Sequence, residues 1–144
     1  MENLDLVNLL TTYQGRINRA KYWIAVAVFV VFAVIIFILN FLLAALGSVG
    51  WFLAILMFIV AYLAMAVLGA FVGIKRLHDR DKSGWWLVLF YGLPIAFNLL
   101  ASWTGMTMIF SLISFAVSIW ALVELGCLRG TVGPNQYGPD PLTT

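Results

Sequence analysis

The sequence has little charge and few of the side chains that bind metals or form disulfides. Only 10% of its 144 residues are charged, and it contains one histidine and one cysteine, Cys127. A single cysteine excludes an internal disulfide, and a zinc site would need three or four suitable ligands. The net charge of +2 is too small to indicate a nucleic-acid partner. We therefore expect no metal, no cofactor and no nucleic acid.

Apolar residues take the place of the missing charge. They make up 64% of the chain, with a mean hydropathy of +1.05, whereas soluble domains are about 45–50% apolar. A membrane-spanning helix needs about 17–25 apolar residues. The runs of that length are 22–46, 49–74, 85–102 and 106–128. They predict an all-α, four-span transmembrane helical bundle formed by a single domain, 1–144. The third run is short and contains Pro94, so a re-entrant segment is the alternative there.

All eight positive charges fall on one side of this four-span topology. Lys and Arg occur in segments 16–21 and 75–82 and at Arg129, but not in the short turns 47–48 and 103–105. Cytoplasmic loops of membrane proteins carry the Lys and Arg excess. We therefore expect both termini and the middle connection to be cytoplasmic.

Aromatic and small residues predict how the spans are placed and packed. Tryptophan favours the lipid–water interface, and the expected anchors there are Trp23, Trp85 and Trp86. Small residues let helices approach closely. Those expected to pack within the bundle are Gly69, Gly73, Ser114 and Ser118. Formation of a homo-oligomer through these small faces is the alternative.

Three polar residues interrupt the apolar runs. Asn40 and Asn98 are expected to hydrogen-bond to each other across the first and third spans, with a substrate path as the alternative. Glu124 lies near the cytoplasmic end of the fourth run, where pairing with Arg129 or with a cation of the middle connection is favoured over a proton relay.

The two ends of the chain differ in pattern from the spans. Leu4, Val7 and Leu10 have helical spacing, so segment 1–21 is predicted to be an interfacial amphipathic helix that breaks near Gly15. The tail, 129–144, is rich in glycine and proline and is expected to form turns in the cytoplasm.

Three segments carry a recognisable set of motifs. They are "GRINRAKYW" (15–23), "KRLHDRDKSGWW" (75–86) and "GPNQYGPDP" (133–141). Their order and spacing resemble a bacterial inner-membrane family catalogued as domain of unknown function 805, and the resemblance covers essentially the whole chain. It implies a small helical membrane domain and brings no activity with it. Asp81 and Gln136 depart from the family pattern, in which a small or polar residue and a basic residue are common.

All three motifs fall on the side that the charges assign to the cytoplasm. We expect the N-terminal segment, the middle connection 75–84 and the tail to fold together, and we name this assembly the polar cap. The residues expected to form a ligand-binding site there are Arg16, Arg19, Arg76, His78, Asp79, Ser83, Asn135, Tyr137 and Asp140. The alternative is that ion pairs among Arg76, Asp79 and Lys82 form only a structural clasp.

The function that this pattern favours is a non-enzymatic module within the lipid bilayer. It would bind an anionic lipid, a small anion or a partner membrane protein at the polar cap. One alternative is a small-solute transporter or channel component that acts as an oligomer and has a continuous polar cavity. Another is a membrane enzyme that uses His78 and Asp79, which would need a nucleophile within reach of both.

Overall fold

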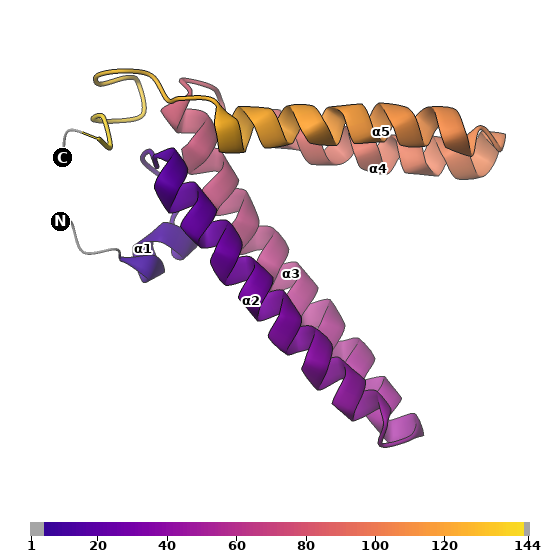
Figure 1. Cartoon of the computed structure of the whole chain (residues 1–144). Helices are drawn as coiled ribbons and strands as arrows, with labels where there is room; N and C mark the ends of the chain where they lie inside the picture. Colours follow the sequence, from indigo (N-terminus) through magenta and orange to yellow (C-terminus); the bar gives the residue numbers. More distant parts are fainter. Residues whose placement is uncertain (1–4, 143–144) are drawn as a thin grey trace.

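The structure is a computed structural model, which describes residues 5–142. Every regular element in this part of the chain is helical (Figure 1). The elements are α1 (Leu6–Thr11), α2 (Arg19–Ala44), α3 (Ser48–Asp79), α4 (Trp86–Thr104), α5 (Thr107–Leu122) and a terminal π-helix (Val123–Cys127). Helices α2, α3 and α4, and α5 together with the π-helix, are long and apolar enough to cross a membrane. The predicted all-α, four-span fold is confirmed.

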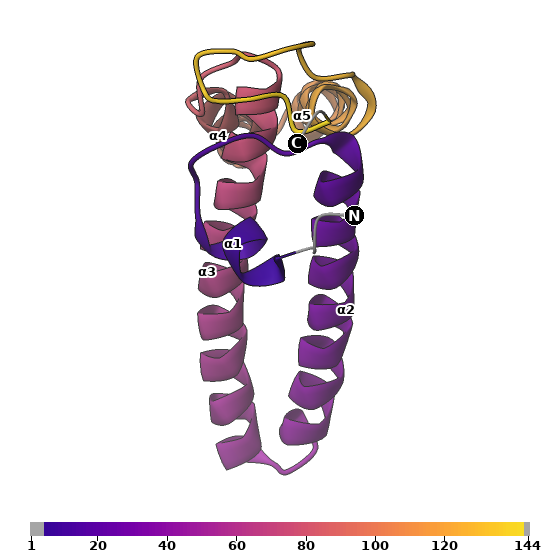
Figure 2. The same ribbon diagram turned by 90° about the vertical axis from the view of Figure 1, so that its left-hand side faces the viewer.

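The four long helices associate two by two. Helices α2 and α3 form one antiparallel hairpin and α4 and α5 form a second, and the hairpins meet at one end and diverge from there (Figure 1). The middle connection, the start of α2 and the tail lie at this junction, and the two short turns lie at the far ends (Figures 1 and 2). The polar segments are therefore gathered at one end of the molecule.

Local sequence explains where several helices begin and end. The side chain of Asp5 accepts a hydrogen bond from the Asn8 N–H (3.0 Å), and that of Asn18 accepts one from the Lys21 N–H (2.9 Å). Each therefore caps the first turn of its helix. Helix α4 ends at Gly105, whose φ of 73° is in the left-handed region that glycine adopts without strain.

The N-terminal segment differs from the predicted helix over 1–21. Leu4 lies outside the described residues, and the described part is helical only over Leu6–Thr11, with Gly15 at a φ of 86°. The reason is a contact with α3: the Lys75 ammonium donates to the carbonyls of Asn8 (2.9 Å) and Leu9 (2.6 Å). Helix α1 consequently lies across the α2–α3 hairpin (Figure 2).

The polar residues within the spans are accommodated inside their own hairpins. Asn40 donates to the Ile36 carbonyl (3.0 Å) and Asn98 donates to the Pro94 carbonyl (2.7 Å). The predicted bond between the two asparagines is wrong, because the first and third spans belong to different hairpins.

The small residues have different surroundings. A Cβ on Gly73 would lie 2.9 Å from Cδ2 of Leu87, so this glycine allows α3 and α4 to come close together near the junction. At Gly69 no atom lies within 4 Å of the corresponding position. Ser118 donates to the Ser114 carbonyl along α5 (2.9 Å).

The three tryptophans expected at the interface also differ. Trp23 donates its indole N–H to the Gly126 carbonyl (3.1 Å), and Trp86 packs edge-on against Trp120 (5.8 Å between ring centroids). Trp85 is 79% exposed. Two of these side chains therefore connect helices as well as lying near the ends of their spans.

Candidate functional site

Asp79, the last residue of α3, is the centre of a buried ion cluster. Its Oδ1 lies 3.1 Å from Nη2 of Arg16, and its Oδ2 accepts a hydrogen bond from Nη1 of Arg76. The three side chains are between 0% and 4% exposed. Two guanidinium groups therefore share one carboxylate in a place that water does not reach.

Arg16 uses its other donors on the tail. Its guanidinium donates to the carbonyls of Thr131 (2.7 Å), Gly133 (2.8 Å) and Gly138 (3.3 Å). Arginine suits this role because its planar group offers five N–H donors in a fixed arrangement. One side chain thus ties the N-terminal segment, α3 and the tail together.

The end of α5 is held by side chains from the first hairpin. The last carbonyls of a helix have no partner within the helix and carry partial negative charge. Here consecutive carbonyls accept side-chain N–H groups from α2 and α3. The pairs are Arg76 with Leu125 (2.7 Å) and Leu128, Trp23 with Gly126 (3.1 Å), and Arg19 with Cys127 (3.0 Å). These bonds join the two hairpins.

A second ion cluster lies on the other side of this joint. The buried carboxylate of Glu124 is 3.0 Å from Nε of Arg80 and 2.9 Å from Nζ of Lys82. Lys82 also lies 4.7 Å from the centroid of the Trp86 ring. Glu124 therefore pairs with cations of the middle connection, one of the two pairings that the sequence suggested.

The tail packs directly on the middle connection. The rings of His78 and Tyr137 are stacked, 3.8 Å apart and within 3° of parallel. Nδ1 of His78 lies 3.2 Å from the Gly15 carbonyl, and Asn135 donates to the His78 carbonyl (2.8 Å). The polar cap is therefore an assembly of all three segments.

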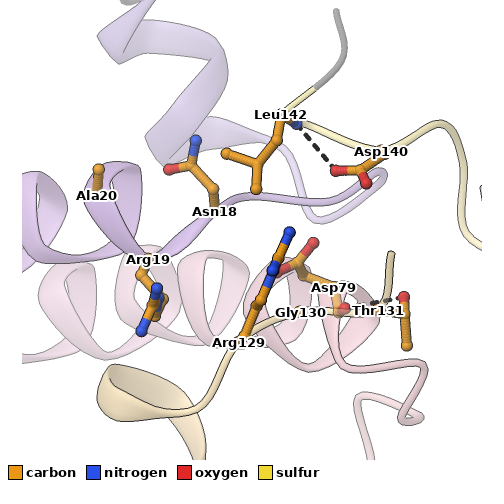
Figure 3. Close-up of a pocket in the computed structure, with 9 residues that line it drawn as sticks. All are labelled: Asn18, Arg19, Ala20, Asp79, Arg129, Gly130, Thr131, Asp140 and Leu142. Atoms are coloured by element: carbon orange, nitrogen blue, oxygen red, sulfur yellow. Dashed lines mark hydrogen bonds between the residues drawn. The ribbon is translucent and has the colours of Figure 1, made fainter. Parts of the chain in front are cut away.

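Asp140 stabilises the last turn of the tail. Its carboxylate accepts hydrogen bonds from the backbone N–H groups of Gly133 and Leu142, both at 2.9 Å; Figure 3 shows the bond from Leu142. These bonds favour the ionised form, and they hold the pKa of Asp140 below its ordinary value.

A pocket of about 270 Å³ opens beside the buried cluster (Figure 3). Its lining residues come from the first turn of α2, the end of α3 and the tail: Asn18, Arg19, Ala20, Asp79, Arg129, Gly130, Thr131, Asp140 and Leu142. Figure 3 shows the Arg129 side chain extending into it from the tail. Among residues 5–142, the Arg129 guanidinium makes no hydrogen bond and no ion pair within 4.0 Å. The pocket therefore presents a cation with unused donors.

The expected site residues separate into three groups. Those in the buried cluster and the tail contacts are Arg16, Arg76, His78, Asn135 and Tyr137. Arg19, Asp79 and Asp140 line the pocket. Ser83 is in neither group, because its hydroxyl accepts only a local bond from the Trp85 N–H (3.3 Å). Within the described range, no three His, Cys, Asp or Glu side chains gather in a way that could hold a metal.

Sequence reasoning missed Arg129 and Gly130 as site residues. Arg129 had been interpreted as one more topological charge or a partner of Glu124. A Cβ on Gly130 would lie 2.0 Å from Oδ2 of Asp79, so only glycine leaves room for the carboxylate there. The sequence offered one indication of their importance: both residues lie between the fourth apolar run and the motif at 133–141.

Comparisons with known proteins agree with the motifs. The family model described as "Protein of unknown function (DUF805)" matches residues 10–139. Relatives in Escherichia coli strain K12 include the inner membrane protein YhaH, 30% identical over 133 residues, which are 90% of this chain and 86% of the relative. The inner membrane protein YhaI is 29% identical over 138 residues, 96% of this chain and 92% of the relative.

The uncharacterized protein YiiR of the same strain is 28% identical over 138 residues, 91% of this chain and 86% of the relative. No solved structure matches the chain significantly. The four spans and the inner-membrane relatives make this a multi-pass inner membrane protein. The expected resemblance is confirmed, and the chain belongs to the DUF805 family.

Proposed function

We propose that this chain is a membrane module that binds a phosphate-like anion in the pocket beside the buried cluster. The observation that carries the proposal is the Arg129 guanidinium, which extends into the pocket and makes no hydrogen bond and no ion pair within 4.0 Å among residues 5–142 (Figure 3). A second guanidinium, that of Arg19, lines the same pocket and gives one N–H to the Cys127 carbonyl. Two arginines around one cavity suit an oxyanion, because guanidinium groups bind such groups through paired hydrogen bonds.

The local charge balance supports an anionic ligand. The pocket and the adjoining cluster hold four arginines and two aspartates, which leaves two positive charges uncompensated. These residues are Arg16, Arg19, Arg76, Arg129, Asp79 and Asp140. Both carboxylates already accept hydrogen bonds from protein donors. Arg129 also interacts electrostatically with Asp140, but its N–H donors make no hydrogen bond within residues 5–142 and stay available to a ligand. A cavity with excess charge of one sign concentrates ligands of the opposite sign.

The first turn of α2 adds two further donors. Arg19 and Ala20 line the pocket, and their backbone N–H groups make no hydrogen bond to a residue in the described range. The N-terminus of a helix carries partial positive charge and favours anions. In this proposal these amides assist the two guanidinium groups and do not act alone.

The proposal places the polar cap in the cytoplasm. Its support is that all eight Lys and Arg residues belong to the segments that meet at the junction. A reporter enzyme that is active only outside the cytoplasm, fused after Thr144, should give no signal, and the same reporter inserted at Gly47 should be active. The reverse pattern would contradict this orientation.

The binding proposal is tested by thermal unfolding of the full chain in a neutral detergent with inorganic phosphate. A ligand that binds the folded state at 100 times its Kd stabilises that state by about 2.7 kcal/mol. We expect phosphate to raise the unfolding temperature of the wild type, and the Arg129→Gln variant to lose most of this increase.

Lys82→Gln is the matched control for this experiment. It removes a positive charge from the same cap, but Lys82 pairs with Glu124 and lies outside the pocket. This variant should keep the response to phosphate. If phosphate stabilises none of the three proteins, or stabilises all of them equally, the pocket does not bind anions and the proposal fails.

The other two function classes have less support. A transport path would need polar groups that face a continuous cavity, whereas Asn40 and Asn98 donate to carbonyls of their own helices. An enzyme would need a reactive group beside His78, whose ring is covered by Tyr137 and whose Nδ1 faces the Gly15 carbonyl. Anion binding is therefore the function that the geometry supports best.

A further inference from the structure

We infer that the anion in this pocket is the phosphate of an anionic phospholipid from the surrounding bilayer. This inference rests on the proposed function and names its ligand. It commits to a lipid headgroup as the source of the phosphate; a pocket that responds to inorganic phosphate but has no effect on lipid retention is the outcome that would contradict it.

The position of the pocket along α2 is the first argument. Asn18, Arg19 and Ala20 line the pocket, and they are the cap and first residues of a helix that crosses the membrane. The helix has 26 residues, or about 39 Å at 1.5 Å per residue, whereas the hydrocarbon core is about 30 Å thick. Because the charged residues of α2, Arg19 and Lys21, are at its N-terminal end, that end projects into the headgroup layer. The pocket therefore lies at the depth of lipid phosphates.

The surface next to the pocket is the second argument. Trp23 is one helical turn beyond Arg19 on the same face of α2, and it is 44% exposed although its N–H is bound to Gly126. Ile24 beside it is 39% exposed, and Leu142, which lines the pocket, is 61% exposed. Trp23 and Ile24 thus present exposed apolar surface one turn further along the membrane-spanning helix than the pocket. A molecule with an anionic head and an apolar tail matches both the pocket and this surface, whereas a soluble anion matches only the pocket.

The charges of the pocket distinguish between classes of phospholipid. All phospholipids have a phosphodiester, but a zwitterionic headgroup also carries an ammonium group. The two guanidinium groups would attract the phosphate and repel that ammonium. The structure therefore favours a lipid with a neutral group beyond its phosphate, such as phosphatidylglycerol, over phosphatidylethanolamine.

Native mass spectrometry of the full chain tests the inference directly. The protein would be presented with equal amounts of phosphatidylglycerol and phosphatidylethanolamine in a neutral detergent, and the retained lipids would be counted. We expect the wild type to prefer phosphatidylglycerol. A hydrogen bond to a charged group contributes about 1.5–3 kcal/mol, so Arg129→Gln should weaken phosphatidylglycerol retention about tenfold or more. Arg129→Lys should restore part of it, and Lys82→Gln should leave it unchanged.

The outcomes separate this inference from the proposal on which it rests. If Arg129→Gln abolishes stabilisation by inorganic phosphate but changes no lipid retention, the pocket binds a soluble anion and the lipid inference is overturned. If Arg129→Gln changes neither measurement, both are overturned. Unfolding without ligand checks that the variant is folded; equal retention of the two lipids by the folded wild type would also overturn the inference.

Discussion

The polar cap contains two pairs of arginines in opposite surroundings. Arg16 and Arg76 are almost fully buried and give their N–H groups to Asp79 and to backbone carbonyls. Arg19 and Arg129 are exposed and line an open pocket. Arginine therefore has two different roles within the polar cap. The two pairs differ in how many of their N–H groups already donate to other residues of the protein.

This difference resolves a choice that the sequence left open. A structural clasp and a ligand site were alternative interpretations of the same charged residues. The geometry supports a clasp formed by the buried pair and the proposed site formed by the exposed pair; Asp79 pairs with the first and lines the same pocket as the second. Substitutions in the buried half should thus change stability, whereas those in the pocket should change binding.

The largest effect is expected from Asp79→Asn. Removing one partner of a buried ion pair leaves the other charge uncompensated and typically costs about 3–5 kcal/mol. Here the substitution would leave both Arg16 and Arg76 without their carboxylate. The topology should be kept, because the positive charges that determine it remain. Unfolding in detergent should show a large loss of stability.

Asp81→Asn is the control for this substitution. Asp81 is exposed, has a φ of 57° that asparagine also tolerates, and accepts only from Gln136 (3.2 Å). The Asp81→Asn substitution removes the same charge from the same connection and should lower the stability of the protein only slightly. Equal stability of Asp79→Asn and wild type would show that the buried cluster does not hold the cap together.

Gly130→Ala should produce the next largest effect. The added methyl group would lie 2.0 Å from Oδ2 of Asp79, so the tail or the carboxylate must move. Overpacking of this kind typically costs about 1–3 kcal/mol. Thermal unfolding would measure it, with Gly69→Ala as the control, because no atom lies within 4 Å of a Cβ there. If Gly130→Ala left the unfolding temperature unchanged, the tail would not lie against Asp79.

A smaller effect is expected where the tail meets the middle connection. Tyr137→Ala would remove the ring stacked on His78, and stacked rings contribute about 1 kcal/mol. The tail should open more often, so trypsin should cleave after Arg129 faster than in the wild type. Tyr137→Phe keeps the ring and should be cleaved at the wild-type rate. If trypsin cleaved the wild type and both Tyr137 variants at the same rate, the stacked rings would not hold the tail on the middle connection.

The fold followed from the sequence because spanning a membrane requires long apolar runs. That requirement determined four helices and two tight turns. It did not determine how the helices associate, since apolar faces are compatible with many arrangements. The ends were also imprecise: α3 continues to Asp79, five residues beyond the apolar run ending at Ile74, because its last turns are buried in the cap instead of in lipid.

The charged motif residues were predictable as a group, but their individual roles were not. Arg16 acts mainly through backbone carbonyls of the tail, and backbone acceptors leave no pattern in a sequence. Gly130 matters for the space that it leaves beside Asp79. Arg129 enters the proposal because its guanidinium donors make no hydrogen bond within residues 5–142. Space and unused donors become visible only when the segments are placed together.

The smallest effect is expected from pH at the end of the tail. Hydrogen bonds from Leu142 and Gly133 lower the pKa of Asp140, so this carboxylate stabilises the tail above its ordinary pKa of about 3.9. The contribution is lost as the pH falls through the lower pKa of the folded state. A spin label on Val132→Cys, in a Cys127→Ser background, should therefore become more mobile only as the pH falls below about 3.9.

Asp140→Asn isolates this carboxylate from the others that titrate in the same range. The amide keeps one acceptor oxygen and has no charge to lose, so the spin label should be somewhat more mobile at neutral pH and should change less on acidification. The difference between the two proteins, not the acid response of either one, measures the contribution of Asp140. If spin-label mobility changes with pH in the same way in both proteins, the bonds from Gly133 and Leu142 to the Asp140 carboxylate do not hold the tail. The negative charge of Asp140 would then not stabilise this side of the pocket.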